Sequence, residues 1–281
     1  MRSTELHRQV FRSGSKTYFN SSLFFPPHVR DDVFILYGFV RVADNYVDAV
    51  PQQVREFEEF VERYRAARAG KSVDDVIIES FVDLERRRGF ESVWADGFLK
   101  SMALDITKRV YSTVEETLEY VYGSAEVIGL YMARIMDLDS EADEAAMMLG
   151  RAMQFINFIR DIDEDNQLGR VYLPLGETTL QDLSPETTRQ SPDEFVRFIR
   201  SQLERYQVWQ TEAEKGFGMI PRRYRVAIKT ASDMYNWTAS VIAKDPFIVY
   251  ERKVKPARAR ILRGILWNLT AGGKIPEEDP R

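Results

Sequence analysis

The stretch AMQFINFIRDIDEDNQLGRVYLP, which runs from Ala152 to Pro174, decides the fold predicted for this chain. Polar side chains recur in it at helical spacings of three and four and so line one face of a helix: Gln154, Asn157, Asp161 and Asp165. Apolar residues occupy the other faces, so the helix is expected to be buried nearly all round. Its polar line must then face something polar inside the protein, and a metal ion with a phosphate is the simplest candidate. Asp163 and Glu164 fall elsewhere on the helix and are expected at a solvated end.

A second apolar helix ends in a similar acidic pair. It is predicted between residues 30 and 49, and its C-terminal end carries Asp44 and Asp48, with Arg41 one turn earlier. An Asp-x-x-x-Asp spacing alone is typical of a solvated helix face. Here each pair ends a core helix, where unpaired carboxylates are too costly to keep. If the two helix ends face each other, four carboxylates converge and bound cations must neutralise them. Mg²⁺ fits because it prefers oxygen ligands and binds carboxylates together with substrate phosphates; Mn²⁺ is the alternative ion.

The composition limits the chemistry that this chain performs. Its 281 residues, 44% hydrophobic and 12% aromatic, are enough for a large core. The absence of cysteine excludes disulfides, thiolate catalysis and zinc-thiolate sites, and two histidines leave almost nothing for an imidazole metal site or a histidine base. The net charge of -5 argues against a nucleic-acid partner. The sequence shows neither a long apolar run nor a signal-like leader, so we expect a soluble, cytoplasmic protein.

Glycine and proline cluster between long periodic segments, which indicates helices with short connections. Alternation with period two never persists, so strands are not expected. The predicted fold class is all-α, with one helical domain over residues 1–270 and a frayed tail over 271–281. The predicted helices cover residues 5–13, 30–49, 52–69, 73–88, 92–107, 114–137, 141–165, 193–215, 221–243 and 256–269, and a surface loop covers 176–192. Small residues in the helix over 114–137 would let another helix or a ligand come close: Gly123, Ser124, Ala125 and Gly129.

Four motifs of the chain, in this order and at these separations, resemble those of the squalene and phytoene synthases. They are Ser15-Lys16-Thr17-Tyr18, RVADNYVD over residues 41–48, Tyr120-Val121-Tyr122-Gly123, and the segment 157–174. The resemblance covers nearly the whole chain, and its last motif is long and specific. It implies a single-domain isoprenoid-synthase helical bundle around a central cavity, with two aspartate-rich helices opposite each other. Members of this family join two prenyl diphosphates head to head through a cyclopropyl diphosphate intermediate.

The resemblance also implies roles for individual residues. The expected metal ligands are Asp44, Asp48, Asn157, Asp161 and Asp165. The expected contacts of the substrate are Ser15, Tyr18, Arg41, Gln154, Asn157, Arg160, Arg170, Tyr235, Arg252 and Lys253. The expected catalytic set combines the four aspartates with Arg41, Tyr120 and Tyr172. Asn45 stands where the family often has a second adjacent aspartate, which implies a slightly altered metal shell. Which of Arg252 and Lys253 takes the role of the family's arginine is left open.

The chemistry of diphosphate loss agrees with these roles. Negative charge develops on the leaving group and positive charge on an allylic carbon, so metal and arginine must meet the first while a dry apolar wall protects the second. Aromatic faces stabilise such a cation. The aromatic candidates are Phe19, Phe39, Tyr120, Phe155 and Phe158, for which ordinary core packing is the alternative interpretation.

The predicted function is the condensation of two geranylgeranyl diphosphates to phytoene. Squalene or dehydrosqualene synthesis from farnesyl diphosphate is the alternative, and a squalene synthase would also need NADPH. A non-catalytic assembly or binding protein of the same fold is the alternative from another class. Retention of all four aspartates and of the segment 169–174 argues against it.

A basic cluster lies near the C-terminus, against an acidic remainder. Its members are Arg252, Lys253, Lys255, Arg258, Arg260 and Arg263. A solvated helix face is the plain interpretation. The alternatives are attraction of diphosphate by its first members and contact with an anionic membrane surface by the rest. Because the product would be a hydrocarbon, we expect peripheral membrane contact without a membrane span; the oligomeric state is left open.

Overall fold

The structure of the protein, a computed structural model, describes residues 6–11 and 25–270. Within these residues the chain is helical and forms no strand, and one parallel bridge joins Val110 to Val171. The all-α fold class is therefore confirmed. Residues 6–11 are helical, inside the helix predicted over 5–13, and the predicted tail lies outside the described residues.

The elements are α3 (Pro27–Asp48), α4 (Val54–Arg68), α5 (Val76–Arg88), α6 (Ser92–Thr107), α7 (Val114–Val121), η1 (Tyr122–Glu126), α8 (Val127–Ile135), η2 (Ser140–Ala142), α9 (Asp143–Arg160), α10 (Ile162–Gln167), η3 (Leu175–Glu177), α11 (Pro185–Gln190), α12 (Pro192–Lys215), η4 (Gly216–Met219), α13 (Arg222–Lys244), η5 (Pro246–Tyr250) and α14 (Arg258–Thr270).

Local sequence signals explain where several helices begin and end. Helix α3 starts with Pro27 in its first turn, where the missing backbone N–H costs no hydrogen bond. The Asp75 carboxylate caps α5 by accepting hydrogen bonds from the backbone N–H groups of Ile77 and Ile78. Gly89 ends α5 in the left-handed conformation, with φ of 63°. These boundaries follow from short-range chemistry and agree with the sequence prediction within a few residues.

Three predicted segments differ from the structure. The helix expected over 114–137 is divided by the π-helical turn η1. The helix expected over 141–165 is interrupted at Asp161, whose φ of -101° and ψ of 16° separate α9 from α10. The loop expected over 176–192 contains α11, because the Ser184 hydroxyl caps it and Pro185 begins it.

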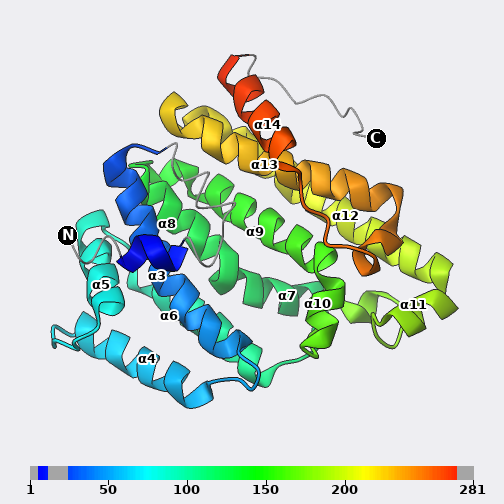
Figure 1. Ribbon diagram of the computed structural model, residues 1–281, viewed down its shortest axis with the longest axis horizontal. Helices are drawn as coiled ribbons and strands as arrows, with labels where there is room; N and C mark the ends of the chain where they lie inside the picture. Colours follow the sequence, from blue (N-terminus) through cyan, green and yellow to red (C-terminus); the bar gives the residue numbers. More distant parts are fainter. Residues whose placement is uncertain (1–5, 12–24, 271–281) are drawn as a thin grey trace.

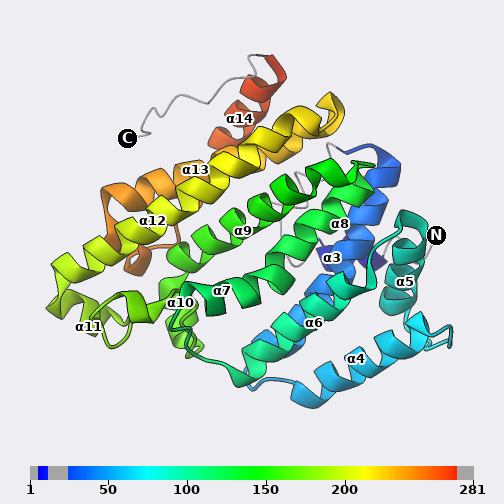
Figure 2. The same cartoon turned by 180° about the vertical axis from the view of Figure 1, so that it is seen from behind.

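Two hydrophobic clusters make up the core. The first joins α3, α4, α5, α6 and α8, and in it Phe39 stacks on Phe81 with ring centroids 3.9 Å apart. The second joins α7, α9, α12 and α13. Helix α9 lies between α8 and α12 (Figures 1 and 2). A cavity between the two clusters is bordered by α3, α8, α9 and α13.

None of the described helices is both long and apolar enough to cross a membrane.

Candidate functional site

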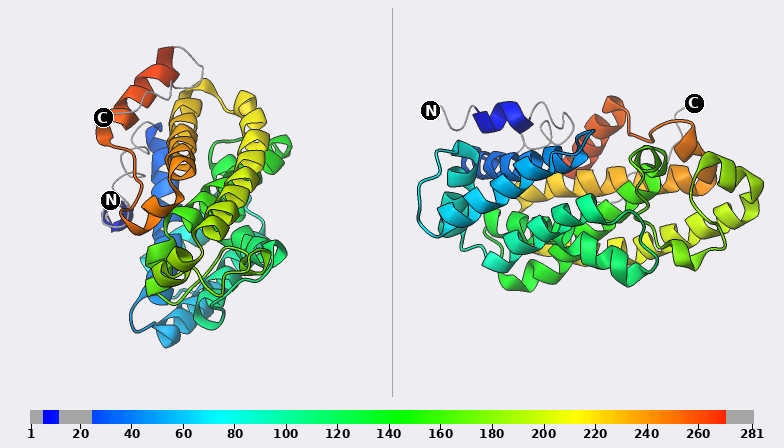
Figure 3. Two further views of the ribbon diagram at one scale, coloured as in Figure 1. Left: turned by 90° about the vertical axis from the view of Figure 1, so that its right-hand side faces the viewer. Right: turned by 90° about the horizontal axis from the view of Figure 1, so that it is seen from below.

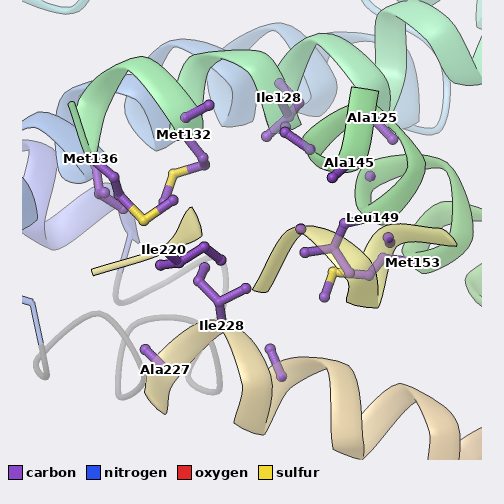
Figure 4. Close-up of a pocket in the computed structure, with 18 of the residues that line it drawn as sticks. Ala125, Ile128, Met132, Met136, Ala145, Leu149, Met153, Ile220, Ala227 and Ile228 are labelled. Atoms are coloured by element: carbon purple, nitrogen blue, oxygen red, sulfur yellow. The ribbon is translucent and has the colours of Figure 1, made fainter. Parts of the chain in front are cut away.

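The cavity is a largely apolar chamber of about 380 Å³. Methionine, isoleucine and leucine side chains from α8, α9 and α13 point into it, as Figure 4 shows for Met132, Leu149 and Ile228. Such flexible and branched side chains form a wall that binds hydrocarbon and excludes water. The cavity is therefore suited to an apolar chain.

Very close contact of α9 with η1 and α8 along glycines shapes one wall of this cavity. A Cβ atom on Gly150 would lie 2.3 Å from the Ala125 carbonyl oxygen, and one on Gly129 would lie 2.2 Å from that of Ala146. No side chain fits at such distances, so both positions require glycine. The expectation that small residues of the helix over 114–137 allow close approach is confirmed for Ala125 and Gly129.

The polar part of the lining comes mainly from α9. Gln154 and Asn157 both line the cavity, as their spacing predicted, whereas Asp161 and Asp165 are not among the lining residues. The Asn157 Oδ1 atom is buried and, among the described residues, accepts no hydrogen bond. A buried acceptor without a donor is costly, so it points to a ligand that supplies positive charge or a proton. Tyr235, from α13, completes this side of the lining.

Asp105, near the end of α6, organises the adjacent polar cluster, although no sequence motif marked it. Its side chain accepts hydrogen bonds from the Tyr172 hydroxyl at 2.6 Å and from the Tyr120 hydroxyl at 2.7 Å. The residue is only 2% exposed, and burial raises the pKa of its carboxyl group. A lone acid in the apolar run Met102-Ala103-Leu104-Asp105-Ile106 was the sequence signal that could have revealed it.

Arg170 connects the two acidic helix ends. Gly169 adopts a left-handed φ of 69° and turns the chain after α10, which brings Arg170 against the end of α3. The Arg170 guanidinium donates to Asp48 Oδ1 at 2.7 Å and to the Val47 carbonyl oxygen at 2.7 Å. It also lies 4.0 Å from Asp105 Oδ1. The Arg170 backbone N–H donates to the Asp165 carbonyl oxygen at 2.8 Å, so this buried arginine lies next to both aspartate motifs.

The other motif aspartates also have basic partners. Arg41 donates to Asp44 at 2.6 Å. Arg160 donates to both oxygens of Asp161, at 2.7 and 2.5 Å. The expected convergence of four carboxylates is not found: in the described chain no three acidic or imidazole groups are close enough to share an ion.

Two of the motif aspartates are strongly perturbed. Burial and the neighbouring Asp48 carboxylate raise the pKa of Asp44 to about 7. Burial and the Asp161 carboxylate raise the pKa of Asp165 to about 8. Carboxyl groups with such pKa values are short of positive charge, and perturbed groups of this kind are typical of functional sites.

The donor set fits Mg²⁺, the ion implied by the sequence. It consists of carboxylate oxygens and the unpaired amide oxygen of Asn157, which lies one helical turn before Asp161. Hard oxygen donors of this type suit Mg²⁺ and provide none of the soft ligands that zinc or copper select.

The basic cluster divides in the structure. Lys253 forms ion pairs with Glu164 and, at 3.2 Å, with Asp161, whereas Arg252 is exposed. Lys253 is thus the member next to the acidic motif. Glu164, expected at a solvated end, is exposed but is also paired with Lys253.

The described aromatic residues expected to face the cation lie outside the lining of the cavity. Phe39, Phe155 and Phe158 belong to the two core clusters and do not line the cavity, so core packing is the correct interpretation for them. Tyr120 is buried next to Asp105. Aromatic lining comes instead from Phe11, Phe25, Tyr37, Phe217 and Tyr235. The candidates Ser15, Tyr18 and Phe19 lie outside the described residues.

Solved structures with this arrangement of helices are known. The chain superposes on a squalene synthase from Alicyclobacillus acidocaldarius with a TM-score of 0.78 and 23% identity, over 87% of this chain and 94% of that one. It superposes on a dehydrosqualene synthase with a TM-score of 0.82 and 19% identity, over 94% of both chains. At these identities the likeness shows the fold.

Relatives found by sequence identify the family of the chain as well as its fold. A 15-cis-phytoene synthase from Paracoccus sp. is 27% identical over 261 residues, which is 89% of this chain and 86% of the relative. A phytoene synthase from Pseudescherichia vulneris is 30% identical, over 81% of this chain and 78% of the relative. The family model for squalene/phytoene synthase matches residues 11–262. Together with the bundle and its cavity, these matches show that the chain is a prenyltransferase that belongs to the squalene/phytoene synthase family.

Proposed function

We propose that this protein condenses two geranylgeranyl diphosphates head to head, through a cyclopropyl diphosphate, to phytoene. The observation that carries the proposal is the apolar cavity whose polar lining, Gln154 and Asn157, leads along α9 to the motif aspartates. An apolar chamber next to a strongly charged cluster matches a substrate with a hydrocarbon tail and a diphosphate head. The relatives named phytoene synthase support the same assignment.

The basic residues of the cluster suit a diphosphate leaving group. Arg41, Arg160 and Lys253 are each partly buried and already paired with a motif aspartate or its neighbour. In the proposed reaction they exchange part of this pairing for diphosphate oxygens, which stabilises the charge that develops as the group leaves. Mg²⁺ bound at the two aspartate pairs, Asp44 with Asp48 and Asp161 with Asp165 beside Asn157, would supply further positive charge.

Asp105 is proposed as a positioning residue. It holds the Tyr120 and Tyr172 hydroxyl groups in fixed directions and lies next to Arg170, which in turn holds Asp48. A network in which each group fixes the next keeps the reacting end of the site rigid. Burial and the surrounding carboxylates raise the pKa values of both tyrosines well above 10, so they act as neutral hydrogen-bonding groups.

Dehydrosqualene or squalene synthesis from farnesyl diphosphate is the second candidate, because solved structures with the same fold carry those names. The two candidates differ in the length of the chain that the cavity must hold. They differ also in whether NADPH is consumed.

The test is incubation of the protein with Mg²⁺ and radiolabelled geranylgeranyl or farnesyl diphosphate, with and without NADPH, followed by extraction of hydrocarbons and assay of released diphosphate. The proposal expects phytoene from the C20 substrate without NADPH. A C30 product from farnesyl diphosphate alone would establish the second candidate. Absence of both product and diphosphate release with either substrate would exclude an enzyme of this class.

A further inference from the structure

The outer side of α14 carries three exposed leucines. Leu262, Leu266 and Leu269 have exposed fractions of 66, 63 and 52%. Their spacings of four and three residues place them on one face of the helix. Exposed leucines scattered singly need no explanation, but three in one line form an apolar stripe.

Polar contacts on the inner side of α14 set the direction of this stripe. The Asn268 side chain donates to Thr230 Oγ1 at 3.1 Å and to Asp233 Oδ2 at 2.8 Å. The Arg260 guanidinium lies 5.1 Å from the centre of the Trp237 ring. Helix α14 therefore packs against α13 on the outside of the bundle (Figures 1 and 3). Its three exposed leucines point away from the bundle.

The surface around the stripe is basic. Residues 220–270 contain eleven arginines and lysines against three acids, although the whole chain has a net charge of -5. Arg258 and Arg263 are exposed on α14 beside the leucines, and Arg252 and Lys255 are exposed just before it. This basic and apolar face contrasts in charge with the acidic remainder of the protein, which is a pattern typical of an attachment face for an anionic surface.

The stripe also lies close to the wall of the cavity. Helix α13 lines the cavity with Ala227, Ile228 and Ala231 and carries α14 through Thr230 and Asp233. One helix thus separates the chamber from the helix that bears the stripe. In the turn before α13, Met219 is 50% exposed and lies in sequence between two lining residues, Phe217 and Ile220.

We propose that the outer face of α14 docks the protein on an anionic lipid bilayer. Leu262, Leu266 and Leu269 enter the boundary of the acyl chains, and Arg258 and Arg263 contact lipid phosphates. The purpose assigned to this docking rests on the proposed function, because a hydrocarbon product needs an apolar destination. The membrane contact expected from the basic cluster is thereby assigned to leucines as much as to arginines, and Lys253 and Arg260 are not part of it.

The test is co-sedimentation of the full chain with vesicles made of equal parts phosphatidylcholine and phosphatidylglycerol, and with vesicles of phosphatidylcholine alone. The variant L262S/L266S/L269S is expected to lower the partition constant on the mixed vesicles at least about tenfold. The variant R258Q/R263Q is expected to lower it by about tenfold on the mixed vesicles and to leave the weak binding to phosphatidylcholine unchanged.

Matched controls remove equally exposed groups from other helices. V76S/V93S/V208S replaces apolar side chains that are 45, 53 and 60% exposed, and R65Q/R86Q replaces exposed arginines of α4 and α5. Both controls are expected to bind vesicles as the unaltered protein does. Binding that the leucine variant does not weaken would overturn the proposal. So would a leucine variant that changes only the sedimentation coefficient, because the stripe would then join two copies of the chain.

Diphosphate release in detergent micelles separates this proposal from the proposed function. The α14 variants should keep full release there, since none of the substituted residues lines the cavity. Loss of vesicle binding with normal release supports docking. If the unaltered protein binds vesicles but releases no diphosphate, the proposed function fails and the docking surface stands.

Discussion

Replacing Asp105 with asparagine is expected to slow turnover while the helical bundle stays folded. Both carboxylate oxygens of Asp105 act as acceptors, one for Tyr172 at 2.6 Å and one for Tyr120 at 2.7 Å. Asparagine keeps one acceptor and replaces the other with a donor, so one tyrosine hydroxyl loses its acceptor. A hydrogen bond to a charged group contributes about 1.5–3 kcal/mol. Since about 1.4 kcal/mol corresponds to a factor of ten, kcat should fall by about ten- to a hundredfold.

The assay is diphosphate release at saturating substrate, together with thermal melting followed by circular dichroism. Asp32→Asn is the matched control, because Asp32 is also a buried carboxylate, 4% exposed and paired with Arg87 and Arg88. Asp32 lies twelve residues before Asp44 in α3, roughly 18 Å along the helix. The control should lose stability but keep kcat.

A double-mutant cycle with Tyr172→Phe adds a readout that a general loss of stability does not produce. If Asp105 acts by holding Tyr172, the losses in kcat of the two single variants should not add in the double variant. Unchanged kcat in Asp105→Asn, or equal kcat losses in Asp105→Asn and Asp32→Asn, would refute the positioning role.

Three other changes test separate parts of the molecule. Asp161→Asn should lower turnover more than about 100-fold because it weakens metal binding, and the fold should stay intact because the change relieves repulsion with Asp165. Lower thermal stability with normal activity would contradict this role. Glu85 is buried, and burial raises the pKa of its carboxyl group to about 7 from an unfolded value near 4.5. The native state therefore binds more protons than the unfolded state. The free energy of unfolding should fall by about 3 kcal/mol as pH rises from 4.5 through 7. Glu85→Gln should flatten this dependence in urea titrations between pH 5 and 8, and an unaltered slope would exclude Glu85 as its source. Gly150→Ala should destabilise the fold by about 1–3 kcal/mol because its Cβ would meet the Ala125 carbonyl oxygen, whereas Gly218→Ala, with open space around it, should not; equal melting temperatures of the two variants would contradict the packing argument.

Much of the helical plan could be predicted because it depends on short-range signals. Helix α6 was predicted to the residue, and α5 ends at Arg88, before Gly89, as expected. The breaks were harder to predict. Asp161 interrupts a segment whose polar residues recur at helical spacing from α9 to Asp165 in α10, and the π-helical turn η1 has α-helical segments on both sides. Such departures depend on neighbouring elements, which local periodicity does not contain.

At the site, the local sequence predicted the aspartates but not the residues with which they pair. Their spacing and their apolar surroundings marked all four, and Gln154 and Asn157 were correctly expected on the cavity side of α9. The sequence did not predict that Arg170 would lie between the two motifs, because its contact with Asp48 joins residues 122 positions apart. Asp105 was missed for the same reason, since its partner Tyr172 is 67 positions away.

Composition, periodicity and motif spacing were sufficient to specify an all-helical chain with two acidic helix ends and a family resemblance, because these properties follow from each segment and its immediate neighbours. The tertiary structure was needed to show which charges pair, which aromatic side chains reach the cavity, and that the leucines of α14 face outward. These properties depend on contacts between residues far apart in the chain. They arise only when the helices pack and burial decides which polar groups must find a partner.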